Sequence, residues 1–391
     1  MILRPYSILT ASVLLIYSLV CQSAIACNAK ETPVSESVEI ISFAKKSIAA
    51  TVRRTSVPAI YNKVYVNTVD SLYSKLEYAN NAGGNTAIYL SNGHYEITKT
   101  LQINKPNILL LSHSGDPKKV VLSGPGMQSQ VEVFHILLVA SHGIVVDGMT
   151  FQNASHHLIQ VQGEKNADNF ILRNCVLQDS YQQLIKITAS NGFTADNGYI
   201  ENCIFQYSEG IGPNWYIGGI DAHGATNWIV QNNLFLNIKS PKQRISEHAV
   251  HFWNKSKHNI VRNNFFVDND RAIGFGMKLK SRADRTQDNI GGSIHNNLIY
   301  HSSKNVGFAD VGIIIENSPD TVISNNFIYQ LHKYPNAIEF RFDDTDNVTI
   351  ENNTINRNIT SRSGAKATLR NNKKLNSGLM QKRMREILIG T

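Results

Sequence analysis

Five stretches of the chain place polar side chains on one face of an otherwise apolar β-strand. They are residues 219–223, 249–253, 272–276, 313–316 and 337–341. Because side chains alternate across a strand, the neighbours of an inward Ile or Val point outward. The first outward column then holds Asp221, His251 and Glu339, and the second holds His223, Trp253, Glu316 and Arg341.

These residue types suit a surface that binds and cleaves a charged sugar chain. Carboxylates and imidazoles transfer protons, arginine pairs with a carboxylate, and tryptophan packs on a sugar ring. Glu247 and His248 precede the second stretch and are candidate substrate-binding residues together with Trp253. Arg271 precedes the third stretch, where Gly274 would leave room for a sugar. The alternative interpretation is a solvated polar face with surface ion pairs.

Cleavage of a uronate chain by β-elimination would give these residues defined roles. The uronate carboxylate is neutralised, a base removes the C5 proton, and an acid protonates the leaving oxygen. The candidates are Arg271 and Arg341 for the carboxylate, His251 for the base, and Asp221, His223, Glu316 or Glu339 for the acid or an orienting group. On a neighbouring coil, Asp221 would lie about 4.8 Å from His251 and would orient the imidazole and raise its basicity.

A repeat built around asparagine would position these stretches. A six-residue pattern occurs at 172–177 and again at 200–205. Its order is an apolar residue, any residue, Asn, a small or polar residue, any residue and an apolar residue. The corner positions 148, 175, 203, 233, 264, 297, 326 and 353 recur every 27 to 33 residues. Such a period with short β-rich runs predicts a β-solenoid. Asn suits its corners because it tolerates left-handed backbone, and stacked Asn amides can hydrogen-bond along the column.

On this repeat, the chain resembles the right-handed parallel β-helix, or pectin-lyase-like, proteins over residues 85–372. The resemblance implies an all-β, right-handed parallel β-helix (solenoid) with short N-terminal and C-terminal helical caps. We expect a signal peptide at 1–26, an N-terminal segment and helical cap at 27–84, the parallel β-helix at 85–372 and a C-terminal helical cap at 373–391. The fold carries lyases, hydrolases, epimerases and non-enzymes, so it does not by itself fix an activity.

Residues 253–256 resemble the Asn-Lys-Ser segment that bears the base lysine in the alginate and dermatan lyases of this fold. The resemblance makes Lys255 an alternative base. The acidic residues that bind calcium ahead of that lysine are not matched, because His248, Ala249 and His251 stand there. Calcium is therefore possible but not indicated, and the sequence requires no cofactor. The pair His248 and His251 gives only weak support for a metal site, because residues three apart on a strand point to opposite faces, so the sequence leaves metal binding open.

The N-terminus has the layout of a secretory signal peptide. Arg4 precedes an apolar stretch at residues 8–20, and a small-residue run, 23–26, ends before Cys27. The same layout resembles a bacterial lipoprotein signal with Cys27 as the acylated residue. We therefore expect an exported protein that is periplasmic, an outer-membrane lipoprotein or secreted. We also expect a monomer. No later stretch is apolar enough to span a bilayer.

The net charge of the chain indicates which class of partner it binds. The formal net charge is +8 at pH 7, which favours acidic partners such as nucleic acid or anionic polysaccharide. Export favours the acidic polysaccharide and argues against nucleic acid.

Cys175 and Cys203 share one corner of successive coils, where we expect buried thiols rather than a disulfide.

Three functions remain open from the sequence. The leading hypothesis is a polysaccharide lyase that acts on a uronate-containing acidic polysaccharide. The second is a glycoside hydrolase, because Glu316 and Glu339 stand on adjacent coils at close to the roughly 5 Å spacing of retaining enzymes. The third is a solenoid without turnover that binds glycan or serves as an envelope structural protein.

Overall fold

The computed structural model describes residues 35–129, 133–190, 192–241, 244–278, 287–303 and 309–390. The expected signal peptide and Cys27 lie outside these residues. Among the described residues, none of the helices is both long and apolar enough to span a membrane.

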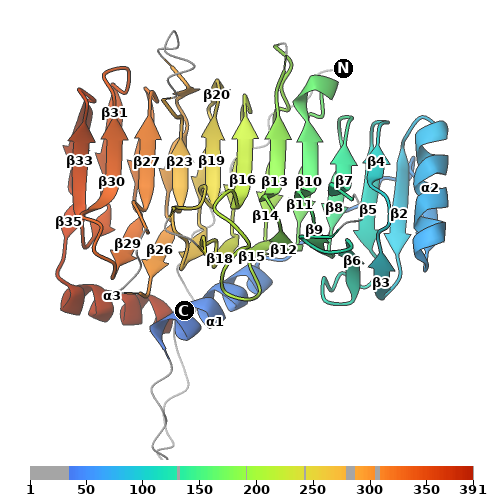
Figure 1. Cartoon of the computed structure of the whole chain (residues 1–391), viewed down its shortest axis with the longest axis horizontal. Helices are drawn as coiled ribbons and strands as arrows, with labels where there is room; N and C mark the ends of the chain where they lie inside the picture. The colour runs from blue at the N-terminus through green and yellow to red at the C-terminus, as the bar shows by residue number, and fades with distance from the viewer. Residues whose placement is uncertain are drawn as a thin grey trace, which may run out of the picture. The chain divides into compact units, whose positions relative to one another are not determined.

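The described chain winds into a parallel β-helix of three long sheets (Figure 1). Sheet A contains β1 (Asn62–Val66), β2 (Thr86–Leu90), β5 (Ile108–Ser112), β8 (Val145–Asp147), β11 (Ile171–Arg173), β14 (Tyr199–Glu201), β17 (Ile229–Gln231), β21 (Ile260–Arg262), β25 (Ser293–His295), β28 (Val322–Ser324), β31 (Val348–Glu351) and β34 (Ala367–Arg370). Sheet B contains β3 (Gly93–Glu96), β6 (Val120–Ser123), β9 (Thr150–Ala154), β12 (Val176–Ser180), β15 (Ile204–Gln206), β18 (Leu234–Leu236), β22 (Phe265–Val267), β26 (Leu298–His301), β29 (Phe327–Gln330), β32 (Thr354–Ile355) and β35 (Lys373–Lys374).

Sheet C, which carries the polar columns, contains β4 (Leu101–Ile103), β7 (His135–Val139), β10 (His157–Gln162), β13 (Gln183–Thr188), β16 (Gly218–His223), β19 (Val250–Trp253), β23 (Ile273–Phe275), β27 (Ile313–Glu316), β30 (Asn336–Arg341) and β33 (Asn358–Arg362). Two short strands, β20 (Ser256–Lys257) and β24 (Asn289–Ile290), pair in parallel outside the three long sheets. A short 3-10 helix spans Gly163–Lys165. All long-sheet neighbours pair in parallel, one coil apart. The expected fold class is confirmed.

A ladder of buried asparagines joins the coils between sheets A and B. The second residue of each corner pair donates from its backbone and its side chain to the carboxamide oxygen of the next, so Asn264 donates to Asn297 at 3.0 and 3.1 Å. Asn297 repeats the pattern with Asn326 at 3.0 Å. The first residue of the pair has left-handed backbone, as at Asn263 and Asn296 with φ of 55° and 56°. Both roles expected of asparagine are therefore present.

Three helices complete the described chain. Helix α2 (Val69–Asn81) begins at Thr68, whose side chain caps the backbone of Ser71, and it covers the first coil with Leu72 and Leu76. It lies at the blue end of the sheets in Figure 1. Helices α1 (Glu36–Ala50) and α3 (Ser377–Ile389) pack on the outward apolar side chains of sheet B, where Ile40 and Met384 share one cluster. Helix α3 lies within the helical cap predicted at 373–391, whereas the sequence analysis predicts no helix at the position of α1.

The core and the corner cysteines follow the same repeat. Inward residues of the three sheets form one long apolar cluster, in which Ile220, Val250 and Ile273 are fully buried register partners. Cys175 and Cys203 are buried free thiols, as expected. Burial raises the pKa of the Cys203 thiol well above its usual value, so this thiol is held in the neutral form.

We predict that Asn297→Ala lowers the free energy of unfolding by about 3 kcal/mol. The change leaves the backbone and side-chain donors of Asn264 buried without their acceptor, at about 1–3 kcal/mol for each unmet group. Urea denaturation followed by circular dichroism measures the loss. The matched control is Asn104→Ala at an exposed position, and equal stabilities of the two variants would contradict the role of the ladder.

Candidate functional site

The strands of sheet C bring the polar residues into the expected columns. Asp221 is the register partner of His251, and His251 is the partner of Gly274. The column continues through Ile314 to Glu339. In the second column His223 pairs with Trp253 and Glu316 pairs with Arg341. Because Gly274 and Ile314 intervene in the first column, His251 and Glu339 stand three coils, or about 14 Å, apart along the solenoid. The polar residues therefore form two groups.

The first group is a cluster centred on the buried carboxylate of Asp221, which is 6 % exposed. We define the Asp221 cluster as Lys186, Asp221, His223, Glu247, His248, His251, Trp253 and Arg271. Lys186 forms an ion pair with Asp221 Oδ2, and the indole Nε1 of Trp253 donates to Oδ1 at 2.6 Å. Lys186 Nζ also lies 2.9 Å from His223 Nε2. Each oxygen of the carboxylate thus has a direct partner.

Electrostatics keep Asp221 ionised despite its burial. Burial alone would raise the pKa of this carboxyl group. The nearby Lys186 ammonium, His223 and His251 outweigh that effect and hold the pKa well below its usual value. The cluster therefore contains a fixed negative charge at neutral pH, compensated chiefly by Lys186.

His251 differs from expectation in its exposure and its basicity. It is 2 % exposed, and its ring stacks on Trp253 with 5.2 Å between centroids. Its Nε2 lies 3.1 Å from the Gly276 carbonyl oxygen, and its Nδ1 lies 4.0 Å from Asp221 Oδ1. The direct hydrogen bond to Asp221 is absent. Burial is the larger effect and lowers the pKa of His251 to about 4, although Asp221 raises this pKa as expected.

His248 occupies the space that Gly274 was expected to leave for a sugar. A Cβ built on Gly274 would approach three ring atoms of His248 at 2.8 to 2.9 Å. His248 precedes β19, so the alternation rule for strands does not apply to it, and its ring lies 4.5 Å from that of His251. The argument that the two imidazoles point to opposite faces is therefore wrong. Burial, followed by His251 and Arg271, lowers the pKa of His248 well below its usual value.

Glu247 and Arg271 stand at the edge of the cluster. Burial raises the pKa of Glu247, while Arg271 opposes that rise. Arg271 is also 3.6 Å from Asp310 through its Nε, and its side chain is 23 % exposed. Arg271 is accordingly a cation that a ligand in solution can reach.

The second group is a closed ion-pair network around the fully buried Glu339. Its carboxylate accepts hydrogen bonds from Tyr334, Asn336 and Arg341, with Arg362 Nη1 3.3 Å away. Arg341 also donates to Glu316 at 3.0 Å. These hydrogen bonds outweigh burial and lower the pKa of Glu339. Glu316, Glu339 and Arg341 thus bind one another, outside the Asp221 cluster.

Lys255 lies apart from both groups in this structure. It is exposed in the turn after β19, with left-handed backbone at φ 77°. Its role as a base stays a prediction.

The sequence argument missed four residues of the two groups. Lys186 is the register partner of Asp221 on the preceding coil, and the pattern Gln-Leu-Ile-Lys at 183–186 would have extended the column by one strand. Tyr334, Asn336 and Arg362 complete the network at Glu339. Tyr334 precedes β30, and no strand pattern could have placed it.

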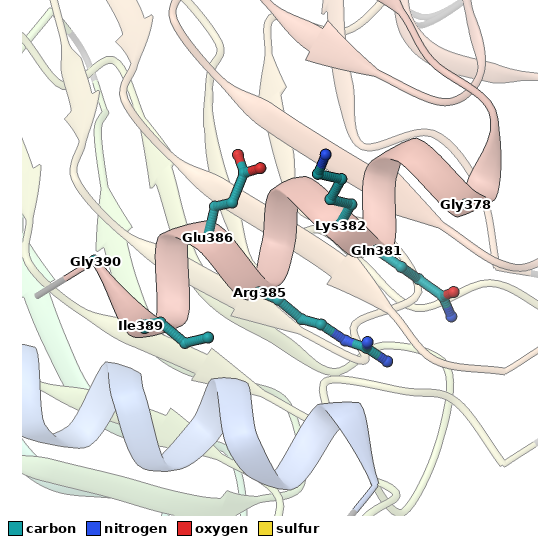
Figure 2. Close-up of a pocket in the computed structure, with 7 residues that line it drawn as sticks. All are labelled: Gly378, Gln381, Lys382, Arg385, Glu386, Ile389 and Gly390. Atoms are coloured by element: carbon teal, nitrogen blue, oxygen red, sulfur yellow. The ribbon is translucent and has the colours of Figure 1, made fainter.

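A surface pocket of about 510 Å³ lies on α3, away from both groups (Figure 2). It is lined by Gly378, Gln381, Lys382, Arg385, Glu386, Ile389 and Gly390. All these residues come from one helix and its end, and none belongs to the polar columns. We assign the pocket no catalytic role.

Known proteins support the fold. A family model described as a right handed beta helix region matches residues 134–290. The N-terminal fragment of bacteriophage Phi29 gene product 12 is similar at a TM-score of 0.52 and 10 % identity, covering 77 % of this chain and 65 % of that one. The catalytic unit of a GH87 alpha-1,3-glucanase from Streptomyces thermodiastaticus strain HF3-3 has a TM-score of 0.50 and 13 % identity, covering 84 % and 68 %.

A mannuronic acid specific polysaccharide family 6 lyase from human gut microbiota has a TM-score of 0.49 and 17 % identity, covering 80 % of this chain and 78 % of that one. No curated protein sequence matches the chain significantly. The chain is a right-handed parallel β-helix, and these identities carry the comparison no further than the fold.

We predict that Lys186→Met destabilises the protein by about 3 kcal/mol at pH 7, because it leaves a buried carboxylate without its counterion. In the native protein, the pKa of Asp221 is lower in the folded state than in the unfolded state. The stability that this ionised carboxylate contributes is therefore present above the unfolded pKa and is lost as pH falls through the folded pKa. Without Lys186, burial raises the pKa of Asp221. Protonation of Asp221 then removes the buried charge and restores part of the stability of the variant. The difference in unfolding free energy should therefore shrink as pH falls through the raised Asp221 pKa of the variant, and it should be smaller at pH 4 than at pH 7.

The double variant Lys186→Met/Asp221→Asn is the control for this pair. It removes both charges, so it should recover most of the stability that Lys186→Met loses at pH 7. Urea denaturation at pH 7 and pH 4 measures both effects. A difference that is the same at both pH values would show that Asp221 is not the group that responds.

Proposed function

We propose that this protein is an exported, carbohydrate-active enzyme that cleaves a uronate-containing polysaccharide by β-elimination. The observation that carries the proposal is the Asp221 cluster, which gathers cations, carboxylates, neutral imidazoles and an indole on adjacent coils of one sheet. The formal net charge of +8 favours an anionic substrate. The signal-peptide layout of residues 1–26 supports export.

Arg271 is the candidate for binding the uronate carboxylate. Its side chain is 23 % exposed at the edge of the cluster, and the planar fork of its guanidinium matches a carboxylate. Neutralising that carboxylate makes the C5 proton of the sugar more acidic. Trp253, which is half-buried beside His223, offers a ring face for the sugar. Arg341 is engaged with Glu316 and Glu339, so we assign it a structural role.

His223 is the candidate base in place of His251. A base must reach the proton that it removes, and the His223 side chain is 20 % exposed, against 2 % for His251. In the reaction, His223 takes the C5 proton, the C5 electron pair forms the C4–C5 double bond, and the C4–O4 bond breaks. Lys186 gives a proton to the leaving oxygen. The proton is taken on His223 Nδ1, and the imidazolium then gives the proton on Nε2 to the neutral Lys186 amine, whose Nζ lies 2.9 Å away.

A glycoside hydrolase is the alternative, since one structural neighbour is an alpha-1,3-glucanase. The pair first considered, Glu316 and Glu339, argues against it, because Glu339 is fully buried and both carboxylates are bound by Arg341. A hydrolase would have to use Asp221 and Glu247 instead. The third alternative is a glycan-binding solenoid without turnover.

We predict that the full chain releases unsaturated uronates from at least one acidic polysaccharide. Alginate, pectate, glycosaminoglycans and ulvan form the panel, and the ultraviolet absorbance of the C4–C5 double bond is the measurement. New reducing ends without this absorbance would indicate the hydrolase. Saturable binding without product would indicate the binding protein, and either result would refute the lyase.

We predict that His223→Gln lowers kcat by about 10² or more on the substrate so identified, because it removes the base. Circular dichroism should show an unchanged fold, since the His223 side chain is partly exposed. The matched control is His94→Gln, a histidine that is 49 % exposed on β3 and pairs only with Glu96 among the described residues. Activity of folded His223→Gln equal to that of the control would move the base to His251 or Lys255.

A further inference from the structure

Three metal-binding side chains meet inside the Asp221 cluster. Glu247, His248 and His251 each offer one ligand atom, and these atoms all lie within 4.8 Å of one another. The two imidazoles are 4 % and 2 % exposed. A half-buried carboxylate and two buried imidazoles at this separation can all reach one ion after small side-chain rotations, since typical metal–ligand bonds are about 2 Å long.

The state of His248 points to a missing ligand. Neither of its ring nitrogens has a hydrogen-bond partner in the described part of the chain. A buried polar group without a partner costs about 1–3 kcal/mol, and most such groups in native proteins are paired. An imidazole that stays neutral keeps one lone pair, and a metal ion can accept it.

His251 is held in the form that a metal ligand requires. The Gly276 carbonyl oxygen can only accept a hydrogen bond, so the proton of His251 lies on Nε2, which donates at 3.1 Å. The lone pair is therefore on Nδ1. Metal-bound histidines commonly donate their other ring N–H to a backbone carbonyl in this way, which fixes the orientation of the ring.

The absence of a side chain at Gly274 lets the His248 ring lie close to His251. Its missing side chain leaves the ring of His248 a place to lie, because a Cβ there would come within 2.8 Å of Nε2. Any larger residue would displace the His248 ring from this place. Gly274 thus maintains the spacing of the three ligands.

We propose that Glu247, His248 and His251 bind a divalent transition-metal ion. Two imidazole nitrogens and one carboxylate suit Zn²⁺, or Fe²⁺ in an open site, whereas Ca²⁺ takes oxygen ligands. Asp221 adds negative charge close to His251, while Arg271 near Glu247 opposes the ion. Three protein ligands leave a position for water or a substrate carboxylate. The proposal does not depend on the lyase reaction.

Binding of metal to the chelator-treated full chain tests the proposal without any substrate. Calorimetric titration with Zn²⁺ should give one site per chain, and Co²⁺ should give a visible absorption band typical of low coordination number. Glu247→Gln keeps the shape of a partly exposed side chain and should weaken Zn²⁺ binding by about tenfold or more. His248→Gln should abolish the Co²⁺ band.

Two further variants separate metal binding from folding. Gly274→Ala leaves every ligand in the chain but displaces His248, so it should weaken binding while circular dichroism remains unchanged. The control His94→Gln should bind as the native chain does. Absence of the site in the native chain, or binding unchanged in folded Glu247→Gln and His248→Gln, would overturn the proposal.

Discussion

The buried asparagine ladder is the interaction on which the remaining structure depends. Each carboxamide from Asn233 to Asn353 accepts a hydrogen bond from the preceding coil and donates one to the following coil, so a shift of one residue at a corner would leave donors and acceptors unmet. The ladder therefore supports the register of all three sheets. Since register decides which residues face outward, it also places Asp221 beside His251 and not beside a core position. Loops of different length can be added between strands without disturbing this order.

Burial sets the protonation states of the charged and titratable groups in the Asp221 cluster. The apolar wall of sheet C and the indole of Trp253 remove water from Asp221, which would favour a neutral carboxyl group, yet Lys186 keeps it ionised. The same burial keeps His248 and His251 uncharged. One small region thus holds a fixed anion, its counterion and two neutral imidazoles. Cations at the rim, chiefly Arg271, can then select for an acidic partner.

Much of the fold could be predicted from the sequence because a solenoid repeats its rules. The spacing of the corner asparagines gave the coils, and inward Ile and Val gave the columns. Features outside the strands escaped these rules. His248 and Tyr334 precede their strands, so their directions depend on loop paths. The burial of His251 depends on the rings of Trp253 and His248, which alternation does not describe. Helix α1 was missed although Ile40, Ala44 and Ile48 recur every four residues.

The central claim is that the Asp221 cluster is the surface that receives an acidic sugar chain. A crystal structure of the folded His223→Gln protein with an oligouronate tests it most directly, because a variant without the base would retain the intact ligand. The account predicts a uronate carboxylate at Arg271 and a sugar ring beside Trp253. An oligosaccharide bound along another face of the solenoid, with the Asp221 cluster empty, would contradict it.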